Sequence, residues 1–454
     1  MIERARPTIA RPGQRLSGRV AAPGDKAISH RALMLGALAV GRTTLRGLTE
    51  CPDVCRTAAA LAAMGAVIAR HPDGIWTVDG IGIGGLMEPD RVLDLGGSAT
   101  GVRLLMGLAA THPMTAVFTG DASLNRQPMA GLITPLERIG AQFIGRAGFY
   151  LPLTVTGAVT PIPIEYELTV ASAEIKSAIL LAGLNIPGRT TVIEAVPTHD
   201  HGEHLLRGFG AKVAIEPLKA GGRRIAIDGQ PELGPQALDL PGDFSSGAFP
   251  LVAALLAEGS DLTLTGIGLN PLRTGLLDTL LEMGAQIEIT NGHVAGEEPV
   301  GDLRVRATRL RGIAVPAERA ARLSNEYPIL AIAAACAEGR TVMHGLDALG
   351  PNARDRLAAL ARGLARCGVK AGIEDGALTI DGAAGPPPGG ARLDTGPDHR
   401  AAMAFLVLGL AARAPVELDD AAPIETEFPD FTDFMRRLGA DIGDLHQDHE
   451  EALR

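Results

Sequence analysis

Six similar segments follow one another along the chain, each defined by its pattern of apolar positions. Every segment contains an amphipathic stretch that closes with an apolar residue, a glycine and a small residue. The closures are Met64-Gly65-Ala66, Ile139-Gly140-Ala141, Phe209-Gly210-Ala211, Met283-Gly284-Ala285, Cys367-Gly368-Val369 and Leu438-Gly439-Ala440. Glycine favours the left-handed backbone that ends many helices, so each closure predicts a helix C-terminus, and the β-branched runs that follow predict strands.

A second, more apolar helix is predicted in every segment. These stretches cover residues 32–40, 102–110, 175–184, 248–256, 329–336 and 401–410. Because they are apolar on all sides, they are expected to be buried. A short turn and a strand follow each one, so the repeating unit is strand, helix, strand, helix, strand. Six such units suggest two clusters of three, with the Pro- and Gly-rich residues 229–241 between them.

Composition narrows the classes of function. The chain has 42 Lys and Arg against 52 Asp and Glu, a net charge of −10, so no overall basic field attracts nucleic acid or a membrane. We expect neither as a partner, and any anion site must be local. The four cysteines form neither a disulfide framework nor a CxxC pair, which favours a reducing compartment. Since Met1–Gly18 lacks the apolar segment of a signal peptide, we expect a cytoplasmic protein.

Metal and nucleotide chemistry are not indicated. His199, His201 and His204 are clustered, but no acid and cysteine pattern adjoins them, so we expect His201 and His204 to lie on a helix surface. The Gly96-Gly97 turn lacks the Gly-Lys-Ser/Thr of a phosphate-binding loop. The sequence therefore predicts no metal ion and no cofactor.

Polar residues gather just before each buried helix, at the entrances 26–31, 96–103, 171–176, 242–246, 324–328 and 398–400. Helix N-termini carry free N–H groups and partial positive charge, so converging entrances would bind anions. Taken one at a time, several residues are explained as helix N-caps: Ser98, Thr100, Ser172, Ser245 and Asp398. The cations near these helices need a partner or a ligand: Lys26, Arg31, Arg103, Lys176, Arg356 and Arg400.

The same entrances carry motifs that resemble the EPSP synthase (3-phosphoshikimate 1-carboxyvinyltransferase) family from end to end. The matching motifs are Pro23-Gly24-Asp25-Lys26, Ser29-His30-Arg31-Ala32-Leu33, Gly120-Asp121-Ala122-Ser123-Leu124, Lys176-Ser177-Ala178, Asn270-Pro271, Arg273-Thr274-Gly275 and Asp398-His399-Arg400. The resemblance implies an α/β fold of two domains, an inside-out α/β barrel with six βαβαββ repeats, three per domain, hinged around a cleft. We expect repeats 1–3 in a domain of residues 21–237, and repeats 4–6 in a domain of residues 1–20 plus 238–454.

The resemblance also implies a reaction and roles for single residues. The family joins shikimate 3-phosphate to phosphoenolpyruvate and releases phosphate, which calls for clustered cations and a proton donor. Lys26 would reach phosphoenolpyruvate, Arg31 would hold the shikimate carboxylate, and Arg356 and Arg400 would clamp the phosphoenolpyruvate carboxylate. The expected catalytic residues are Lys26, Asn325, Glu326 and His399. The expected substrate-binding residues are Lys26, Arg31, Ser98, Thr100, Arg103, Gln127, Ser172, Ala173, Glu174, Asn325, Arg356 and Arg400.

Several positions depart from the family pattern. Asn325 stands where the family has Asp, and Ala353 where it has Glu, so two proposed proton carriers are absent. The other departures are Asn352 for Lys, Ala27 for Ser, Gln127 for Arg, Glu174 for Gln and Gly97 for Asn. These changes lead us to expect modified chemistry on shikimate 3-phosphate or a related cyclic acid.

Three interpretations remain open. In the first, the chain is an ordinary transferase in which Arg126, Arg354 and Glu326 replace the missing groups. In the second, it is a lyase that eliminates phosphate or water without phosphoenolpyruvate, where stabilising a leaving anion is most of the task. In the third, it is a non-catalytic homologue that binds a ligand. The expected partners are small anionic substrates, and we expect a monomer.

Overall fold

The computed structural model describes residues 5–219, 221–349 and 351–445, which fold as two compact units. Unit 1 takes its residues from 1–23, 242–293 and 299–454, and unit 2 consists of 24–241 and 294–298. The chain thus leaves unit 1 after residue 23 and returns at residue 242. A short excursion at residues 294–298 joins unit 2 again.

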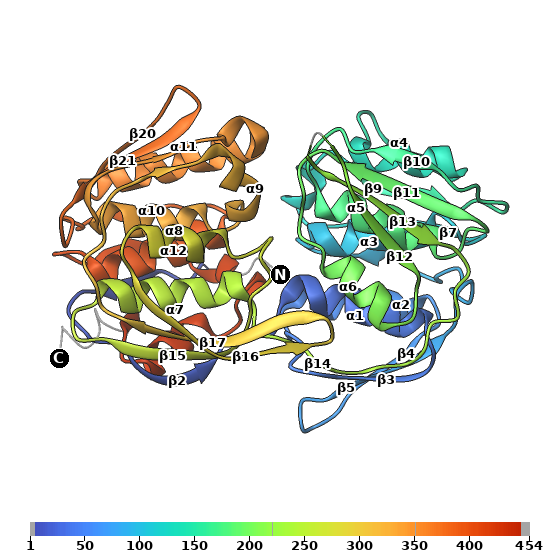
Figure 1. The fold of residues 1–454 in the computed structure, drawn as a ribbon, viewed down its shortest axis with the longest axis horizontal. Coiled ribbons are helices and arrows are strands. Elements are labelled where there is room, and N and C mark those ends of the chain that lie inside the picture. The colour runs from blue at the N-terminus through green and yellow to red at the C-terminus, as the bar shows by residue number, and fades with distance from the viewer. Residues whose placement is uncertain (1–4, 220, 350, 446–454) are drawn as a thin grey trace. The chain divides into compact units, whose positions relative to one another are not determined.

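Unit 2 contains the first six α-helices (Figure 1). Its helices are α1 (Lys26–Leu38), α2 (Pro52–Ala63), α3 (Ala99–Ala109), α4 (Ala130–Ile139), α5 (Ala173–Gly183) and α6 (His201–Gly208), with the 3₁₀ turn η1 (Leu124–Arg126). Its strands are β3 (Val40–Arg46), β4 (Val67–Arg70), β5 (Trp76–Ile81), β6 (Leu93–Asp94), β7 (Thr115–Thr119), β8 (Gln142–Arg146), β9 (Tyr150–Thr156), β10 (Glu165–Glu167), β11 (Arg189–Glu194), β12 (Val213–Pro217), β13 (Arg223–Asp228) and β14 (Ala237–Asp239).

Unit 1 contains the remaining elements. Its helices are α7 (Phe244–Leu256), α8 (Gly275–Glu282), α9 (Ala320–Leu323), α10 (Tyr327–Cys336), α11 (Pro351–Arg366), α12 (His399–Ala411) and α13 (Phe431–Arg437), with η2 (Ala317–Arg319), η3 (Leu346–Leu349) and η4 (Ala422–Thr426). Its strands are β1 (Thr8–Arg11), β2 (Ser17–Ala21), β15 (Asp261–Gly268), β16 (Gln286–Ala295), β17 (Glu298–Arg306), β18 (Ala314–Val315), β19 (Glu338–Met343), β20 (Lys370–Glu374), β21 (Ala377–Ala383), β22 (Arg392–Leu393), β23 (Val416–Leu418) and β24 (Asp441–Asp444).

Six four-stranded sheets share one plan. In β6-β7-β9-β8, for example, β6 and β7 are parallel while β9 is antiparallel to both β7 and β8. Alternation drives the pairing, since Leu151, Leu153 and Val155 of β9 are buried on one face. The N-terminal β1 completes the sheet β22-β23-β1-β24, and β14 completes β14-β3-β5-β4. Each unit therefore holds three sheets.

Apolar helices form the centre of each unit, and the sheets lie outside them. In unit 1, α7, α10 and α12 pack on one another, and in unit 2, α3 packs against both α1 and α5 (Figure 1). Along α10 the side chains from Ile329 to Ala335 are all buried, as expected for a helix that is apolar on every side. The predicted buried helices and the inside-out α/β barrel fold are confirmed.

The predicted helix ends are confirmed as well. Gly65, Gly140, Gly210, Gly284, Gly368 and Gly439 all adopt positive φ, between 78° and 115°. Each sheet of the described residues has four strands, as in the βαβαββ repeat implied by the resemblance, whereas the apolar pattern alone predicted three strands per repeat. The missed strands include β6, β18 and β22, each of two residues, which are too short to show an alternating pattern.

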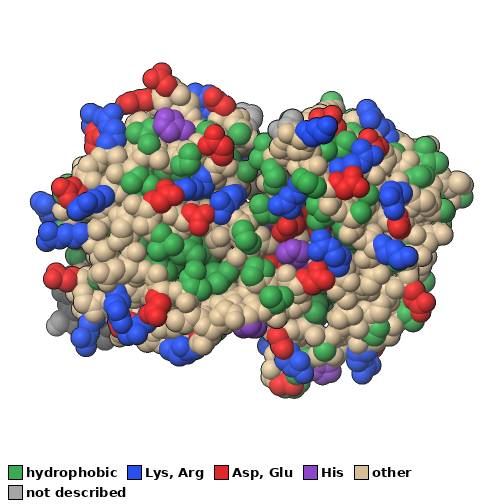
Figure 2. Space-filling model, in the orientation of Figure 1, with side chains coloured by type: hydrophobic (Ala, Val, Ile, Leu, Met, Phe, Trp, Pro, Cys, Tyr) green, Lys and Arg blue, Asp and Glu red, His purple; other side chains and the backbone are tan. Residues whose placement is uncertain are grey.

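Surface charge is mixed on both units. Figure 2 shows Lys and Arg side chains interspersed with Asp and Glu on the visible face of each unit. Many of them form exposed ion pairs, such as Arg42 with Asp79 and Arg340 with Asp381. Within the described residues, no helix is both long and apolar enough to span a membrane. A local cluster of positive charge that could bind an anion is therefore expected at particular helix N-termini rather than over a whole face.

Candidate functional site

Lys26 begins α1 in unit 2 and is held by an acid on the next helix. The side chain of Asp25 caps α1 by accepting from the backbone N–H of Ile28. The Lys26 Nζ lies 2.7 Å from Oδ2 of Asp53, which is buried in the first turn of α2. The ammonium group is thus fixed at the N-terminus of α1, where anions are favoured.

Arg31 lies one turn further along α1 and is almost fully buried, at 2% exposure. Its Nη2 donates to the hydroxyl of Ser177 at 2.8 Å, and its Nη1 donates to the carbonyl of Ala27 at 2.9 Å. Neutral oxygens therefore orient this guanidinium, in keeping with a role in binding an acid.

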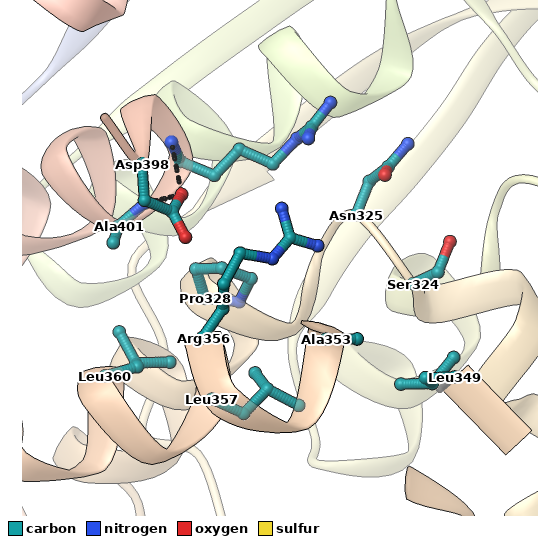
Figure 3. A pocket seen from close by; sticks show the side chains of 11 residues that line it. Ser324, Asn325, Pro328, Leu349, Ala353, Arg356, Leu357, Leu360, Asp398 and Ala401 are labelled. Atoms are coloured by element: carbon teal, nitrogen blue, oxygen red, sulfur yellow. Dashed lines mark hydrogen bonds between the residues drawn. The ribbon is translucent and has the colours of Figure 1, made fainter. Parts of the chain in front are cut away.

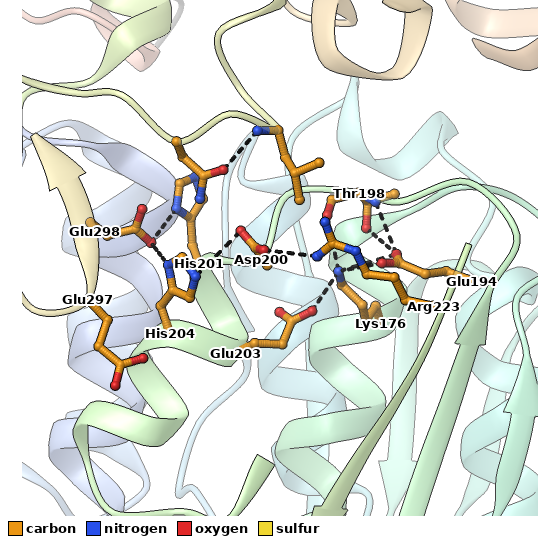
Figure 4. A network of polar contacts seen from close by, with 12 residues as sticks. Lys176, Glu194, Thr198, Asp200, His201, Glu203, His204, Arg223, Glu297 and Glu298 are labelled. Atoms are coloured by element: carbon orange, nitrogen blue, oxygen red, sulfur yellow. Dashed lines mark hydrogen bonds and ion pairs between the residues drawn. The ribbon is translucent and has the colours of Figure 1, made fainter. Parts of the chain in front are cut away.

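Lys176 does not belong to this set of entrance cations. It is completely buried, with Nζ 2.7 Å from Oε1 of Glu203 and 3.2 Å from Oε2 of Glu194 (Figure 4). A buried ammonium between two carboxylates is already paired. Of the two alternatives expected for this cation, a partner or a ligand, the structure shows the partner, and Lys176 joins α5 to β11 and α6.

Arg103 and Thr100 of α3 meet Glu174 of α5 and Gln127, which follows η1. Glu174 of α5 accepts from Arg103 Nη1 at 2.8 Å and from the Thr100 hydroxyl at 2.7 Å. Gln127 accepts from Arg103 Nη2 at 3.1 Å. Burial raises the pKa of Glu174, but Arg103, Thr100 and the nearby Arg31 together lower it below its ordinary value. This acid is therefore ionised at neutral pH.

Helix capping accounts for part of the predicted set. Ser98 caps α3, Ser172 caps α5 beside the buried Ala173, and Asp398 caps α12, each by accepting from backbone N–H groups. Thr100 and Ser245, also expected as caps, are not: Thr100 donates to Glu174, and Ser245 follows the true cap of its helix. Both hydroxyls belong to side-chain networks instead.

In unit 1, Glu326 lies at the start of α10 and is 2% exposed. The hydroxyl of Ser245 donates to Glu326, and Arg273 Nη2 donates to that same hydroxyl at 2.7 Å. Burial is the largest influence and raises the pKa of Glu326 more than Arg273 and the Ser245 hydrogen bond lower it. This carboxyl group is therefore the one at the site that favours the protonated form.

Arg400 and His399 begin α12 and both face Glu427. The Arg400 Nη2 donates to Oε1 of Glu427 at 2.8 Å, and His399 Nε2 lies 3.5 Å from Oε2. The Glu427 side chain is 5% exposed, against 18% for Arg400. The capping carboxylate of Asp398 also accepts from the backbone of Arg400 at 3.1 Å.

A small cavity of about 20 Å³ adjoins this pair in unit 1, with room for roughly one water molecule. It is lined by Ser324, Asn325, Pro328, Leu349, Ala353, Arg356, Leu357, Leu360, Asp398, Arg400 and Ala401. Figure 3 shows the guanidinium of Arg356 extending from α11 toward Asn325, while Ala353 presents only a methyl group. Arg356, Arg400 and the amide residue Asn325 thus line the same cavity.

Two cations proposed as replacements lie elsewhere on their helices. Arg354 is exposed and forms an ion pair with Asp347 at 3.3 Å, so its positive charge already has a partner at the protein surface. Arg126 is exposed in η1. Arg354, which belongs to the same unit as the cavity, is not among its lining residues.

The expected residues therefore fall into two groups, one in each unit. Unit 2 holds Lys26, Arg31, Ser98, Thr100, Arg103, Gln127, Ser172, Ala173 and Glu174, and unit 1 holds Asn325, Glu326, Arg356, His399 and Arg400. Sequence reasoning missed Glu427 as a partner of Arg400, because 27 residues separate them and no motif joins them. It also missed Arg273, although this residue lies within a motif that carried the resemblance.

The histidines of α6 are a further correction. His201 is 3% exposed and His204 partly buried, and both rings contact Oε1 of Glu298, at 2.8 and 3.0 Å (Figure 4). They are not surface residues. Both side chains point toward residues 294–298, which belong to the same unit. The spacing of residues in the sequence does not predict that this segment lies beside α6.

Together these groups can bind anions and carry a proton. Arginine forks suit carboxylates and phosphates, and a protonated buried carboxyl can act as a general acid. That combination suits addition to an anionic double bond followed by loss of phosphate.

Comparison with known proteins points to the same chemistry. The model of the family described as EPSP synthase (3-phosphoshikimate 1-carboxyvinyltransferase) matches residues 10–435. A 3-phosphoshikimate 1-carboxyvinyltransferase of Parvibaculum lavamentivorans is 56% identical over 431 residues, covering 95% of this chain and 96% of its own. One from Paramagnetospirillum magneticum is 55% identical over 438 residues, covering 96% and 98%.

Solved structures agree. The EPSP synthase of Acinetobacter baumannii superposes with a TM-score of 0.87 at 36% identity, covering 96% of this chain and 99% of its own. The enolpyruvyl transferase NikO of Streptomyces tendae shares the fold, with a TM-score of 0.73 at 21% identity, covering 97% and 99%. Because the family match spans nearly all of the described residues and these relatives are more than half identical, the chain belongs to the EPSP synthase (3-phosphoshikimate 1-carboxyvinyltransferase) family.

Proposed function

We propose that this chain transfers the carboxyvinyl group of phosphoenolpyruvate to shikimate 3-phosphate and releases phosphate. The activity for which its relatives are named supports the reaction. One observation supports the site: a buried carboxyl of raised pKa, Glu326, lies in the unit that also carries Arg356 and Arg400. We expect small anionic substrates and no cofactor.

Each substrate anion is assigned to one set of cations. Arg356 and Arg400 hold the phosphoenolpyruvate carboxylate, for which planar guanidinium groups are well suited. Arg31 binds the shikimate carboxylate, Ser172 contacts its phosphate, and Lys26 reaches phosphoenolpyruvate. Thr100 and Arg103 complete the unit 2 surface through their contacts with Glu174, and Gln127 does so by accepting from Arg103.

Glu326 is proposed as the proton carrier. The oxygen of the substrate hydroxyl bonds to the central carbon of phosphoenolpyruvate and the hydroxyl proton passes to water, while Glu326 adds a proton to the methylene carbon. Loss of that proton from the resulting methyl group then expels phosphate and restores the double bond. One carboxyl that starts protonated can donate in the first step and accept in the second. Asn325 and Ala353 cannot hold this proton.

The finer proposal is that this chemistry is modified from that of the family. Glu174 and Glu427 pair with Arg103 and Arg400, so part of the cationic charge is neutralised before any substrate binds. This observation favours a second candidate, a lyase that eliminates phosphate or water from a shikimate-type acid. There the carbon–oxygen bond to the leaving group breaks and a carboxylate takes the proton from the adjacent carbon.

Phosphorus NMR combined with product mass distinguishes the candidates. The purified protein is incubated with shikimate 3-phosphate, with and without phosphoenolpyruvate. The transferase predicts phosphate and a carboxyvinyl adduct only when both substrates are present. Phosphate release from shikimate 3-phosphate alone would establish the lyase. No turnover, combined with substrate-dependent stabilisation against heat, would leave a ligand-binding homologue.

We further propose a cytoplasmic location and a monomeric state. The four cysteines are free thiols, which suits a reducing compartment. Light scattering coupled to size exclusion measures the mass of the particle directly, and a dimer would contradict the proposal.

A further inference from the structure

Glu427 pairs with Arg400, one of the two arginines that the proposed reaction needs to bind the phosphoenolpyruvate carboxylate. It follows η4, and its Oε1 accepts from Arg400 Nη2 at 2.8 Å while Oε2 lies 3.5 Å from His399 Nε2. At 5% exposure, its carboxylate is largely removed from water. A short charge-assisted contact in such surroundings is stronger than one on the surface.

Arg400 is nevertheless not saturated by this contact. Within the described residues, its Nε–H is buried and has no hydrogen-bond acceptor. A buried donor without an acceptor is costly, and it is a feature that a ligand can satisfy. Arg400 lines the small cavity described above. Arg356 and Asn325, which Figure 3 shows, line the same cavity. One part of Arg400 thus holds Glu427, while its Nε–H has no acceptor and can be satisfied by a ligand carboxylate.

We propose that Glu427 is an internal carboxylate ligand of Arg400 that competes with the carboxylate of the incoming substrate and so sets the affinity of this subsite. The proposal rests on the proposed function only for naming that acid as phosphoenolpyruvate. Before binding, the negative charge of Glu427 opposes a second carboxylate near Arg400. Removing that charge, while keeping a side chain of similar shape, makes the guanidinium fully available.

Glu427 also acts on Glu326, which gives a second readout. The other charged groups acting on Glu326 are Arg273 and Arg400, which favour its ionised form, whereas Glu427 raises its pKa. Glu427 is therefore a positioning residue for the proton carrier as well. Neutralising it lowers the pH at which Glu326 loses its proton, and a purely structural role for Glu427 does not predict that shift.

Phosphoenolpyruvate binding to three variants tests the proposal by titration calorimetry, without shikimate 3-phosphate. We expect Glu427→Gln to bind about tenfold more tightly than the wild type, equivalent to about 1.4 kcal/mol. Glu427→Asp keeps the charge but withdraws it by one methylene, and should bind a few times more tightly than wild type. Glu425→Gln is the matched control on η4, because Glu425 pairs with the exposed Arg6 and should leave affinity unchanged.

Circular dichroism and a thermal melt check that each variant is folded. If Glu427→Gln does not fold, Glu427→Asp still decides: tighter binding supports the proposal, and unchanged or weaker binding overturns it. For a folded Glu427→Gln, unchanged or weaker affinity likewise overturns it.

The outcome is separable from that of the proposed function. Tighter binding in Glu427→Gln with no carboxyvinyl adduct from any variant supports competition at Arg400 and overturns the transferase. If all variants form the carboxyvinyl adduct and bind phosphoenolpyruvate with identical affinity, the transferase is supported and competition at Arg400 is overturned.

Discussion

Glu174 in unit 2 and Glu326 in unit 1 are both acids at helix entrances, yet their pKa values move in opposite directions. Burial disfavours the charge of each. Glu174 receives direct bonds from the Arg103 guanidinium and the Thr100 hydroxyl, whereas Glu326 receives its bond from the neutral Ser245. The pKa of the side chain that contacts a cation directly is lowered, and the pKa of the one that meets a cation through a hydroxyl is raised.

This difference gives the two units different chemical abilities. Unit 2 presents fixed charges, which orient anionic groups without exchanging protons. Unit 1 combines a guanidinium pair with a buried carboxyl whose pKa is raised above its ordinary value. The predictions below alter one side of this comparison at a time.

Replacing Arg400 should have the largest effect. Arg400→Ala removes the cation that contacts both Glu427 and the cavity, and leaves Glu427 buried without that partner. Breaking a buried pair costs about 3–5 kcal/mol of folding stability. Separately, loss of the guanidinium proposed to bind the substrate carboxylate should lower kcat/KM by about a thousandfold. Arg392→Ala, which removes an exposed partner of Asp419, is the control. Wild-type kinetics in Arg400→Ala would exclude the proposed carboxylate clamp.

Neutralising the proton carrier should have the next largest effect. Glu326→Gln should reduce kcat by about a hundredfold or more, because an amide cannot exchange the proton. Stability should change in the opposite sense. A raised pKa means that the native state binds the proton more tightly, so Glu326 stabilises the protein below pH 4.5 and this contribution is lost as pH rises through its native pKa.

Urea unfolding measures that second effect. We expect Glu326→Gln to be more stable than wild type at neutral pH and to lose this advantage in mild acid. A variant that is equally active at neutral pH would remove Glu326 from the mechanism.

Restoring two family carboxylates should give a moderate gain. Asn325→Asp with Ala353→Glu places acids beside the cavity of Arg356 and Arg400. If the chain is an attenuated transferase, kcat for adduct formation should rise by about tenfold, at the lower end of general acid–base effects. No gain would indicate that the unit 1 site has been rebuilt for other chemistry. Each single substitution is the control for the pair.

The smallest effect is expected on the unit 2 side. Glu174→Gln removes an ion pair whose acid is 29% exposed, so the loss of stability at neutral pH should be about 1 kcal/mol. Because the pKa of Glu174 is lowered, its contribution is present above pH 4.5 and disappears as pH falls through the native pKa. The urea midpoints of variant and wild type should therefore converge in acid. A difference that grows in acid would contradict the assignment.

Much of this structure could be predicted from repeated local patterns. The glycines after each amphipathic helix and the apolar runs that follow gave the helices and their burial, because both depend on neighbouring residues. Two-residue strands such as β6 carry too little pattern to be seen. The sequence also pointed to Arg400 and Glu326, since they lie in motifs at helix entrances.

Partners brought together by tertiary structure could not be predicted. Glu427 lies 27 residues from Arg400 along the chain, and Glu298 lies 97 residues from His201. Only the fold places these carboxylates beside their cations or rings. The same holds for pKa values, because they depend on burial and on distances between distant residues.

Carbon-13 NMR of the glutamate side-chain carboxyls, titrated in the wild type, Glu326→Gln and Glu174→Gln, tests the central claim most directly. Each variant identifies its own signal by the loss of one resonance. The account predicts that Glu326 titrates above pH 4.5 and Glu174 below it. A Glu326 resonance that titrates at or below that of Glu174 would contradict the assignment of Glu326 as the proton carrier.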